Sequence, residues 1–369
     1  MTPPIIKKLI VKLETSTPLF IALLAAGAAI RLIYCALPPL YTTDLLRNLG
    51  YGKAFPVWGF RLYDLTPSDL TPSPMQYLWP NHNFPYPAVT LLFYALIACL
   101  HSSLFFGKLA LTLIDAVNAR LIFKISQDRI LAALYWFNPI NIWFGSREGQ
   151  FEPFVILLML LALRELQKGR SRAYFYLGLA VQAKLFPIFL APYFLSRLSW
   201  RELGRCVRVA VWGAASLVPS LAAACTSGYM AYFFRPGYIP AYNPITWNLG
   251  DPSLYPFFPF SLVLAHGIAG FAFVLFCLYG LRRTRQLMQW LAPLVFVFFV
   301  KFNRIGQFWY LMLTPAFCLT VEEPSCRRWL FLFSAALGVR SLYSILIGPI
   351  GYYNPPDAQY LNILCFWGF

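Results

Sequence analysis

A cluster of four charged or amide side chains interrupts an otherwise apolar part of the sequence, in the stretch F-N-P-I-N-I-W-F-G-S-R-E-G-Q-F-E-P. The four residues are Arg147, Glu148, Gln150 and Glu152. A lipid-facing or apolar environment does not accept this density of charge, so the cluster must face water or a polar cavity. Arginine offers a bidentate fork to phosphate oxygens, and carboxylates accept hydrogen bonds from sugar hydroxyls. An ion pair of Arg147 with Glu148 or Glu152 in a solvated turn is the evenly weighted alternative.

Asp44, in Y-T-T-D-L-L-R-N, is the acid best placed for general-base chemistry. It follows the first apolar run closely and lies at the start of a long polar stretch. A carboxylate in this position can take the proton from a hydroxyl acceptor. Two simpler interpretations stay open: an interfacial loop acid, or the N-cap of a helix that begins at Leu45.

Cationic residues in apolar surroundings are the third feature. Lys184 lies in A-K-L-F-P, where its charge is costly unless it is paired or faces water. A contact with a lipid phosphate suits an ammonium group, and snorkelling to the interface is the alternative. The same alternatives apply to a later segment, K-F-N-R-I-G-Q-F-W-Y, with the candidates Lys301, Asn303, Arg304 and Gln307.

Composition indicates one integral membrane domain over residues 1–369. The chain is 59% hydrophobic and 12% charged, whereas soluble proteins have roughly 25% charged residues. Its formal net charge of +16 comes from short basic clusters between apolar runs, as the positive-inside rule requires, so nucleic acid is not an expected partner. Eight cysteines without a C-x-x-C pair and three scattered histidines argue against disulfides and metal sites.

The order of apolar runs and basic clusters predicts an all-α bundle of about eleven transmembrane helices. Lys7, Lys8 and Lys12 precede a first span at Thr17–Ala36, which reads as a signal anchor with its far end outside. The outer loop 37–87 is long enough to be functional and is expected to carry a juxtamembrane helix within residues 85–102. A second outer loop covers residues 226–256. The remaining expected spans are Phe105–Ile125, Ile130–Phe144, Phe151–Leu163, Ala173–Leu195 as two short helices hinged near Lys184 and Pro187, Val209–Cys225, Phe257–Leu281, Leu287–Val300, Trp309–Val321 and Leu330–Ile347.

This topology places all the candidate residues on the outer side. Cations on that side run against the positive-inside bias, so an outward-facing site for an anion explains Arg147, Lys184, Lys301 and Arg304. We therefore expect the two outer loops to be active-site elements.

The ordered motifs resemble a known family. L-Y-W-F-N-P, then G-S-R-E-G-Q-F-E-P, then G-L-A-V-Q-A-K-L-F-P-I-F-L-A-P, look like the polyprenyl-phosphate-sugar-dependent glycosyltransferases of the C superfamily (GT-C). The pattern is similar to that of GPI mannosyltransferase I, with its F-N-P, S-R-G-N and K-x-Y-P segments. It is also similar to the bacterial polyprenyl-phosphomannose-dependent mannosyltransferases, whose matching segment carries G-Q. The segment from Phe302 to Pro315 resembles a later family segment, F-N-x-x-x-x-Q-Y with a following proline.

The resemblance implies a function and roles. It implies inverting transfer of a hexose, mannose, from a polyprenyl phosphate to a hydroxyl of a lipid or glycan acceptor, at the outer face of a bacterial inner membrane. Asp44 matches the catalytic acid of the first outer loop, and the cations would hold the donor phosphate. The substrate-contact candidates are Glu148, Gln150, Glu152, Asn303 and Gln307. The eukaryotic enzyme has D-x-D where this chain has Asp44, Leu45 and Leu46, which argues against a divalent metal, and we expect no cofactor. Glu148 also replaces the glycine of S-R-G-N, so acceptor contacts are expected to differ.

Two other classes of function stay open. A lipid-linked sugar flippase or transporter also needs cations within the membrane, although transporters usually carry internal repeats, and none is evident here. A noncatalytic membrane subunit would have no use for charges gathered on one face.

Overall fold

The structure is a computed structural model of the 369-residue chain, and it describes residues 16–40, 44–70, 83–198, 202–234, 289, 292–293, 296 and 308–347. All regular elements in these ranges are helices, which confirms the predicted all-α class for the described part of the chain. The α-helices are α2 (Thr17–Ala36), α3 (Asp44–Trp58), α5 (Ala88–Leu100), α6 (Leu104–Ser126), α7 (Arg129–Trp136), α8 (Glu152–Gln167), α9 (Ala173–Ala183), α10 (Ala191–Ser196), α11 (Leu203–Ser216), α12 (Val218–Ala223), α13 (Ser227–Phe234), α17 (Thr314–Cys318) and α18 (Pro324–Ile347). Shorter 3₁₀ elements are η1 (Gly59–Tyr63), η2 (Pro67–Asp69), η4 (Phe186–Leu190) and η6 (Phe308–Leu313), and η3 (Asn141–Arg147) is a π-helix.

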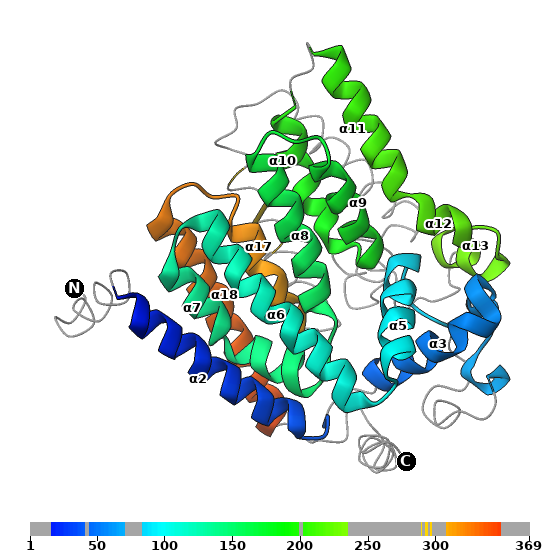
Figure 1. Cartoon of the computed structure of the whole chain (residues 1–369), viewed down its shortest axis with the longest axis horizontal. Coiled ribbons are helices and arrows are strands. Elements are labelled where there is room, and N and C mark those ends of the chain that lie inside the picture. Colours follow the sequence, from blue (N-terminus) through cyan, green and yellow to red (C-terminus); the bar gives the residue numbers. More distant parts are fainter. Residues whose placement is uncertain are drawn as a thin grey trace, which may run out of the picture.

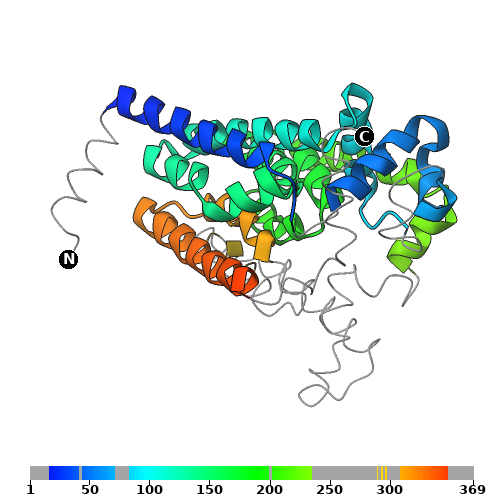
Figure 2. The same ribbon diagram turned by 90° about the horizontal axis from the view of Figure 1, so that it is seen from below.

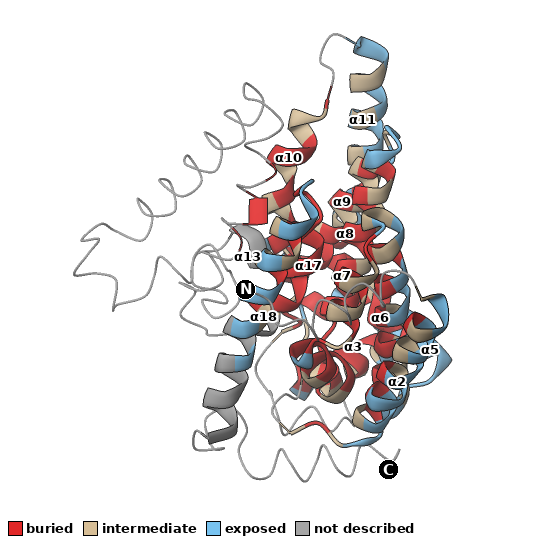
Figure 3. Cartoon of the chain, turned by 90° about the vertical axis from the view of Figure 1, so that its left-hand side faces the viewer, coloured by how far each residue is buried: buried red, intermediate tan, exposed pale blue. Residues whose placement is uncertain are grey.

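The centre of the bundle is formed by α8 and α17, whose ribbons are mostly buried in Figure 3, and α6 and α9 pack against α8. Figures 1 and 2 show α2 along one edge of this centre and α18 on its opposite side, with α6 and α7 between them. Large apolar side chains nevertheless remain exposed on the outer helices. Ile33 of α2 is 62% exposed and Leu203 of α11 is 76% exposed. The bundle therefore has an apolar core and an apolar outer surface.

Helix α2 matches the predicted first span residue for residue. It is the one helix in the described ranges that is long and apolar enough to cross a membrane by itself. Helices α5 and α6 are also long and apolar enough to cross a membrane if they are taken together, although they are bent by 118° relative to each other. The structure thus supports one span, or two with the bent pair, and the predicted count of eleven stays a prediction.

The predicted helix break at Lys184 is confirmed. Helix α9 ends at Ala183, and Lys184 has an extended backbone (φ −156°, ψ 137°) before the 3₁₀ turn η4. Pro187 lies inside that turn and cannot continue the N–H ladder of an α-helix. The chain therefore reverses here, and the lysine side chain lies at the end of α9 rather than along it.

Two local predictions differ from the structure. The stretch 37–87, expected to be an outer loop, contains helix α3, in line with the alternative of a helix that begins near Leu45. Its buried face includes Leu45, Leu49 and Tyr51, and Pro56 falls only in its last turn. The predicted single span Ile130–Phe144 is broken: α7 ends at Trp136, and the π-helix η3 follows. Pro139 in the F-N-P motif explains the break, because a proline disfavours helical backbone in the residue before it.

A buried polar network fixes η3 within the bundle. Arg31 of α2 pairs with Asp115 of α6 at 2.5 Å and donates a hydrogen bond to Ser146 of η3 at 3.3 Å. Its Nε and Nη2 donate to the carbonyl of Trp136 at 3.3 and 3.1 Å. Breaking a buried pair is costly, so this network holds α2, α6 and η3 in one arrangement.

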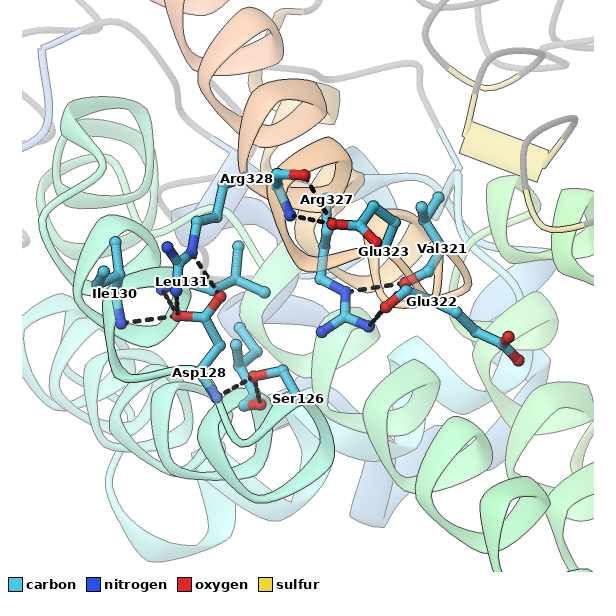
Figure 4. A network of polar contacts seen from close by, with 11 residues as sticks. Ser126, Asp128, Ile130, Leu131, Val321, Glu322, Glu323, Arg327 and Arg328 are labelled. Atoms are coloured by element: carbon cyan, nitrogen blue, oxygen red, sulfur yellow. Dashed lines mark hydrogen bonds and ion pairs between the residues drawn. The ribbon is translucent and has the colours of Figure 1, made fainter. Parts of the chain in front are cut away.

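A second network joins α18 to the turn between α6 and α7 (Figure 4). Arg328 contacts both carboxylate oxygens of Asp128, at 2.7 and 3.0 Å, and Asp128 also caps the first turn of α7. The neighbouring Arg327 donates to the carbonyl of Val321 at 2.9 and 2.7 Å. Arg328 thus joins α18 to the α6–α7 turn, and Arg327 joins the first turn of α18 to the segment before it.

Candidate active site

Asp44 is the first residue of α3, and both of its carboxylate oxygens have partners. Arg47 contacts Oδ1 at 2.7 Å, and Gln150 donates from Nε2 to Oδ2 at 3.2 Å. The Asp44 side chain is 20% exposed, whereas that of Arg47 is 1% exposed. Asp44 is therefore held in one orientation and still accessible, and a general base needs both properties.

Glu152 and Lys184 form a buried ion pair beside Asp44. Glu152 is the first residue of α8, and Lys184 reaches it from the break after α9; the two side chains are 0% and 8% exposed. The ammonium nitrogen also lies 4.0 Å from the centre of the Tyr310 ring and 5.0 Å from that of Phe151. Asp44 is close enough to interact electrostatically with both members of the pair. The acid, the cation and the second carboxylate thus form one site.

Several buried polar atoms around Asp44 have no hydrogen-bond partner within the described residues. They are Gln150 Oε1, Glu152 Oε2 and both amide atoms of Asn48. Asn48 lies one helical turn after Asp44 in α3. Buried polar groups are nearly always satisfied in folded proteins, so this concentration is unusual and distinguishes the surroundings of Asp44.

The polar stretch that interrupts the apolar sequence faces two ways. Gln150 and Glu152 point to Asp44 and Lys184, as described above. Arg147 instead donates from Nε to the carbonyl of Pro38 at 3.4 Å and lies over the Trp143 ring, 4.5 Å from its centre. Both carboxylate oxygens of Glu148 accept from the Leu40 amide at 3.1 Å. The sequence left two alternatives for this stretch: contacts with a sugar or phosphate, or an ion pair of Arg147 with Glu148 or Glu152. Glu152 does form an ion pair, but its partner is Lys184.

The π-helix η3 explains this division. The Glu148 amide donates to the Trp143 carbonyl at 2.9 Å, five residues back, and the Gln150 amide donates to the Phe144 carbonyl at 2.8 Å. Such widened turns occur frequently at functional sites. Here the wider turn directs Arg147 and Glu148 toward residues 38–40, and Gln150 and Glu152 toward Asp44 and Lys184.

Gly149 is the turning point between these two groups. Its φ is +73°, and a Cβ at this position would lie 2.4 Å from a methyl group of Leu45, the residue after Asp44. Glycine adopts this backbone freely, and any other residue is strained there. The absence of a side chain therefore lets the polar stretch approach the start of α3.

We expect Gly149→Ala to lower both the melting temperature and the activity, because the methyl group would push Leu45 and Asp44 away from Gln150. Gly169→Ala is the matched control: its φ is +68°, but nothing lies within 4 Å of the added Cβ. The control should lose only about 1–2 kcal/mol of stability from backbone strain. Thermal unfolding of both variants measures the difference, and equal effects would show that the Leu45 contact is unimportant.

Four predicted site residues lie outside the described residues: Lys301, Asn303, Arg304 and Gln307. Their predicted contacts with the donor stay predictions. The end of the same segment is described, and it brings the Tyr310 ring to Lys184. Of the predicted outer loop 226–256, only residues 226–234 are described, as part of the turn before α13 and α13 itself.

Sequence reasoning missed Arg47, Asn48 and Lys108 as parts of this region. Lys108 is fully buried in α6 and donates to the Leu37 carbonyl. A signal was present for it, because a lysine inside the apolar run 105–125 marks a functional position by default. Arg47 follows Asp44 by three residues, a spacing at which helical side chains meet.

A shallow cavity of about 400 Å³ lies elsewhere, between the α8–α9 turn and α11. Its lining includes Arg170, Arg172, Arg205 and Arg208, and none of the predicted site residues. Arg170 and Arg172 pair with Glu165 behind them. This arginine-lined cavity is separate from the Asp44 site.

Comparison with known families now adds to this geometry. The model of glycosyltransferase family 87 matches residues 75–303, more than half of the chain. The chain belongs to glycosyltransferase family 87. The matched part of this family 87 glycosyltransferase includes Gln150, Glu152 and Lys184, whereas Asp44 precedes it. Among curated proteins, none matches the chain.

Proposed function

We propose that this family 87 glycosyltransferase is an inverting membrane enzyme. It transfers a hexose, mannose, from a polyprenyl-phosphate donor to a hydroxyl group of a lipid or glycan acceptor. The observation that carries the proposal is the partly exposed Asp44 carboxylate beside the buried Glu152–Lys184 pair. The resemblance to GPI mannosyltransferase I and to the bacterial polyprenyl-phosphomannose-dependent enzymes supports the donor class and mannose.

In this reaction, Asp44 removes the proton from the acceptor hydroxyl and keeps it. The resulting oxygen nucleophile forms a bond to the anomeric carbon from the face opposite the phosphate. The bond between that carbon and the phosphate oxygen breaks, and its electron pair leaves with the polyprenyl phosphate. A fixed cation stabilises this developing negative charge, and Lys184 is the described residue that supplies it.

Other cationic and polar residues are proposed to bind the phosphate and the sugar of the donor. Arg147 engages Pro38 through Nε, so its terminal Nη groups are the part of the guanidinium that can bind phosphate. Lys301 and Arg304 are proposed as further phosphate ligands, and Asn303 and Gln307 as sugar ligands with Gln150 and Glu152. Glu148 is left out of this set, because its two carboxylate oxygens bind the Leu40 amide. No metal or other cofactor is part of the proposal.

The exposed apolar side chains of α2 and α11 support placement of the bundle in a membrane. Water does not favour such a surface, whereas lipid does. The proposal further places several spans in an inner membrane, with the Asp44 site on the outer side. The basic α8–α9 turn and the start of α11 would lie on the inner side.

The test uses the purified protein in nanodiscs with radiolabelled polyprenyl-phosphate mannose and a total lipid extract as the acceptor source. We expect label in a new glycolipid, with the anomeric configuration opposite to that of the donor, as checked by NMR. Parallel reactions with polyprenyl-phosphate glucose and with a nucleotide sugar define the donor. Transfer from the nucleotide sugar alone, or transbilayer movement of the labelled lipid without covalent transfer, would overturn the proposal.

A further inference from the structure

A short backbone link connects the first helix to the candidate active site. Residues 37–40 follow α2 and have the sequence L-P-P-L, and Asp44 begins α3 four residues later. Proline has no N–H group, so Leu40 supplies the only backbone donor among residues 38–40. The link is extended at its start, with Leu37 at φ −85° and ψ 145°. The Leu37 N–H still donates to the Tyr34 carbonyl of α2 at 3.2 Å, and residues 38–40 lie beyond this helix end.

Three charged side chains from distant parts of the sequence bind this link in succession. Lys108 donates to the carbonyl of Leu37, and Arg147 donates to the carbonyl of Pro38. The Glu148 carboxylate accepts from the Leu40 amide through both of its oxygens, each at 3.1 Å. Cations thus meet carbonyl oxygens and the carboxylate meets the N–H group, so each charge matches its backbone partner.

Glu148 offsets part of the charge of Lys108, whereas Arg147, a second cation, repels it. Lys108 and Glu148 are each 0% exposed, and Lys108 interacts electrostatically with both Glu148 and Arg147. A buried lysine is costly without such a partner. Glu148 supplies such a partner for Lys108, and both side chains also hydrogen-bond the connecting segment 37–40.

The same polar stretch contacts the chain again just beyond the link. Gly149 packs against Leu45, and Gln150 donates to Asp44 at 3.2 Å. Residues 147–150 therefore contact both the segment before Asp44 and Asp44 itself, while Lys108 holds the far end of that segment. Any loosening of the link would move the carboxylate relative to Lys184.

We propose that Lys108, Arg147 and Glu148 form a clamp on residues 37–40 that positions the Asp44 carboxylate, with Lys108 as a positioning residue that touches neither substrate. The inference rests on the proposed function for its effect on turnover. The clamp itself is a property of the substrate-free protein, so it can be tested without any reaction.

The first test is hydrogen–deuterium exchange of the substrate-free protein in nanodiscs. We expect Lys108→Met and Glu148→Gln each to speed exchange in peptides that cover residues 37–46, with the Leu40 amide affected most in Glu148→Gln. Lys124→Met is the matched control, because Lys124 lies on the same helix but is exposed. Unchanged exchange at residues 37–46 in both folded variants would overturn the clamp. Glu148→Gln keeps the size and one acceptor oxygen, so it provides the test if Lys108→Met does not fold.

The second test measures turnover. A displacement of about 1 Å in a catalytic group can cost on the order of 100-fold in rate, so we expect kcat to fall about 10- to 100-fold in Lys108→Met. The donor KM should change little, and Lys108→Arg should recover part of kcat. A rise in KM with unchanged kcat would instead make Lys108 a donor ligand and overturn its positioning role. Faster exchange in the variants together with no transfer by the wild-type protein would leave the clamp standing and reject the proposed function.

Discussion

Replacing Asp44 by Asn should lower kcat by about 100- to 10,000-fold, the range that a general base contributes. Asparagine keeps the size of the side chain and can still contact Arg47 and Gln150, but it cannot accept the proton of the acceptor hydroxyl. Donor binding depends on the cations and should persist. Steady-state transfer to lipid acceptor measures the first quantity, and retention of labelled donor by the purified variant measures the second.

Asp69→Asn is the control for this prediction. Asp69 lies in the same stretch between α2 and α5 and is exposed, and the Thr66 amide donates to its carboxylate at 2.7 Å. This backbone hydrogen bond lowers the pKa of Asp69, so the group is ionised at neutral pH like an ordinary acid. The variant removes one negative charge from the same segment without touching the site. Near wild-type turnover in Asp44→Asn, or an equal loss in both variants, would reject Asp44 as the base.

Replacing Lys184 by Met should both destabilise the protein and abolish efficient transfer. The change leaves the Glu152 carboxylate buried without its cation, and breaking a buried pair in this way costs about 3–5 kcal/mol. Methionine keeps the length and apolar stem of the lysine, so lost packing contributes little. The midpoint of thermal unfolding and kcat are measured on the same preparation.

The double variant Lys184→Met, Glu152→Gln separates stability from function. Removing both charges of a buried pair is often neutral for stability, so the melting temperature should recover most of the loss. Transfer should stay low, because no cation remains at this position to stabilise the leaving phosphate. Recovery of both properties would show that Lys184 serves only to pair with Glu152, and a stable single variant would contradict the buried ion pair.

Local sequence patterns predicted several elements correctly. The apolar run Thr17–Ala36 is a helix with the predicted bounds, and the apolar run 105–125 is α6 with one extra residue at each end. The break at Lys184 followed from Pro187. These features depend on hydrophobicity and on proline, which act over a few residues. The same local patterns left the start of α3 only as one alternative for Asp44, because this helix is stabilised by burial of Leu45, Leu49 and Tyr51 against other parts of the bundle.

The partners of the site residues came from the tertiary structure. The sequence by itself determined that Asp44, Gln150, Glu152 and Lys184 are chemically unusual, since charges and amides at the ends of apolar runs need polar surroundings. It left open which of them meet. Glu152 and Lys184 are 32 residues apart, and Gln150 and Asp44 are 106 apart, so no local spacing predicts these pairs.

The charged stretch after the F-N-P motif shows the same division most clearly. Its composition alone requires a polar environment, whichever way the side chains point. Only the wider turn of η3 and the left-handed backbone at Gly149 decide that Arg147 and Glu148 bind the link before Asp44, while Gln150 and Glu152 face Asp44 and Lys184. The direction of a side chain depends on the backbone geometry of its turn and on the close approach of Leu45, and neither is encoded in hydrophobic periodicity.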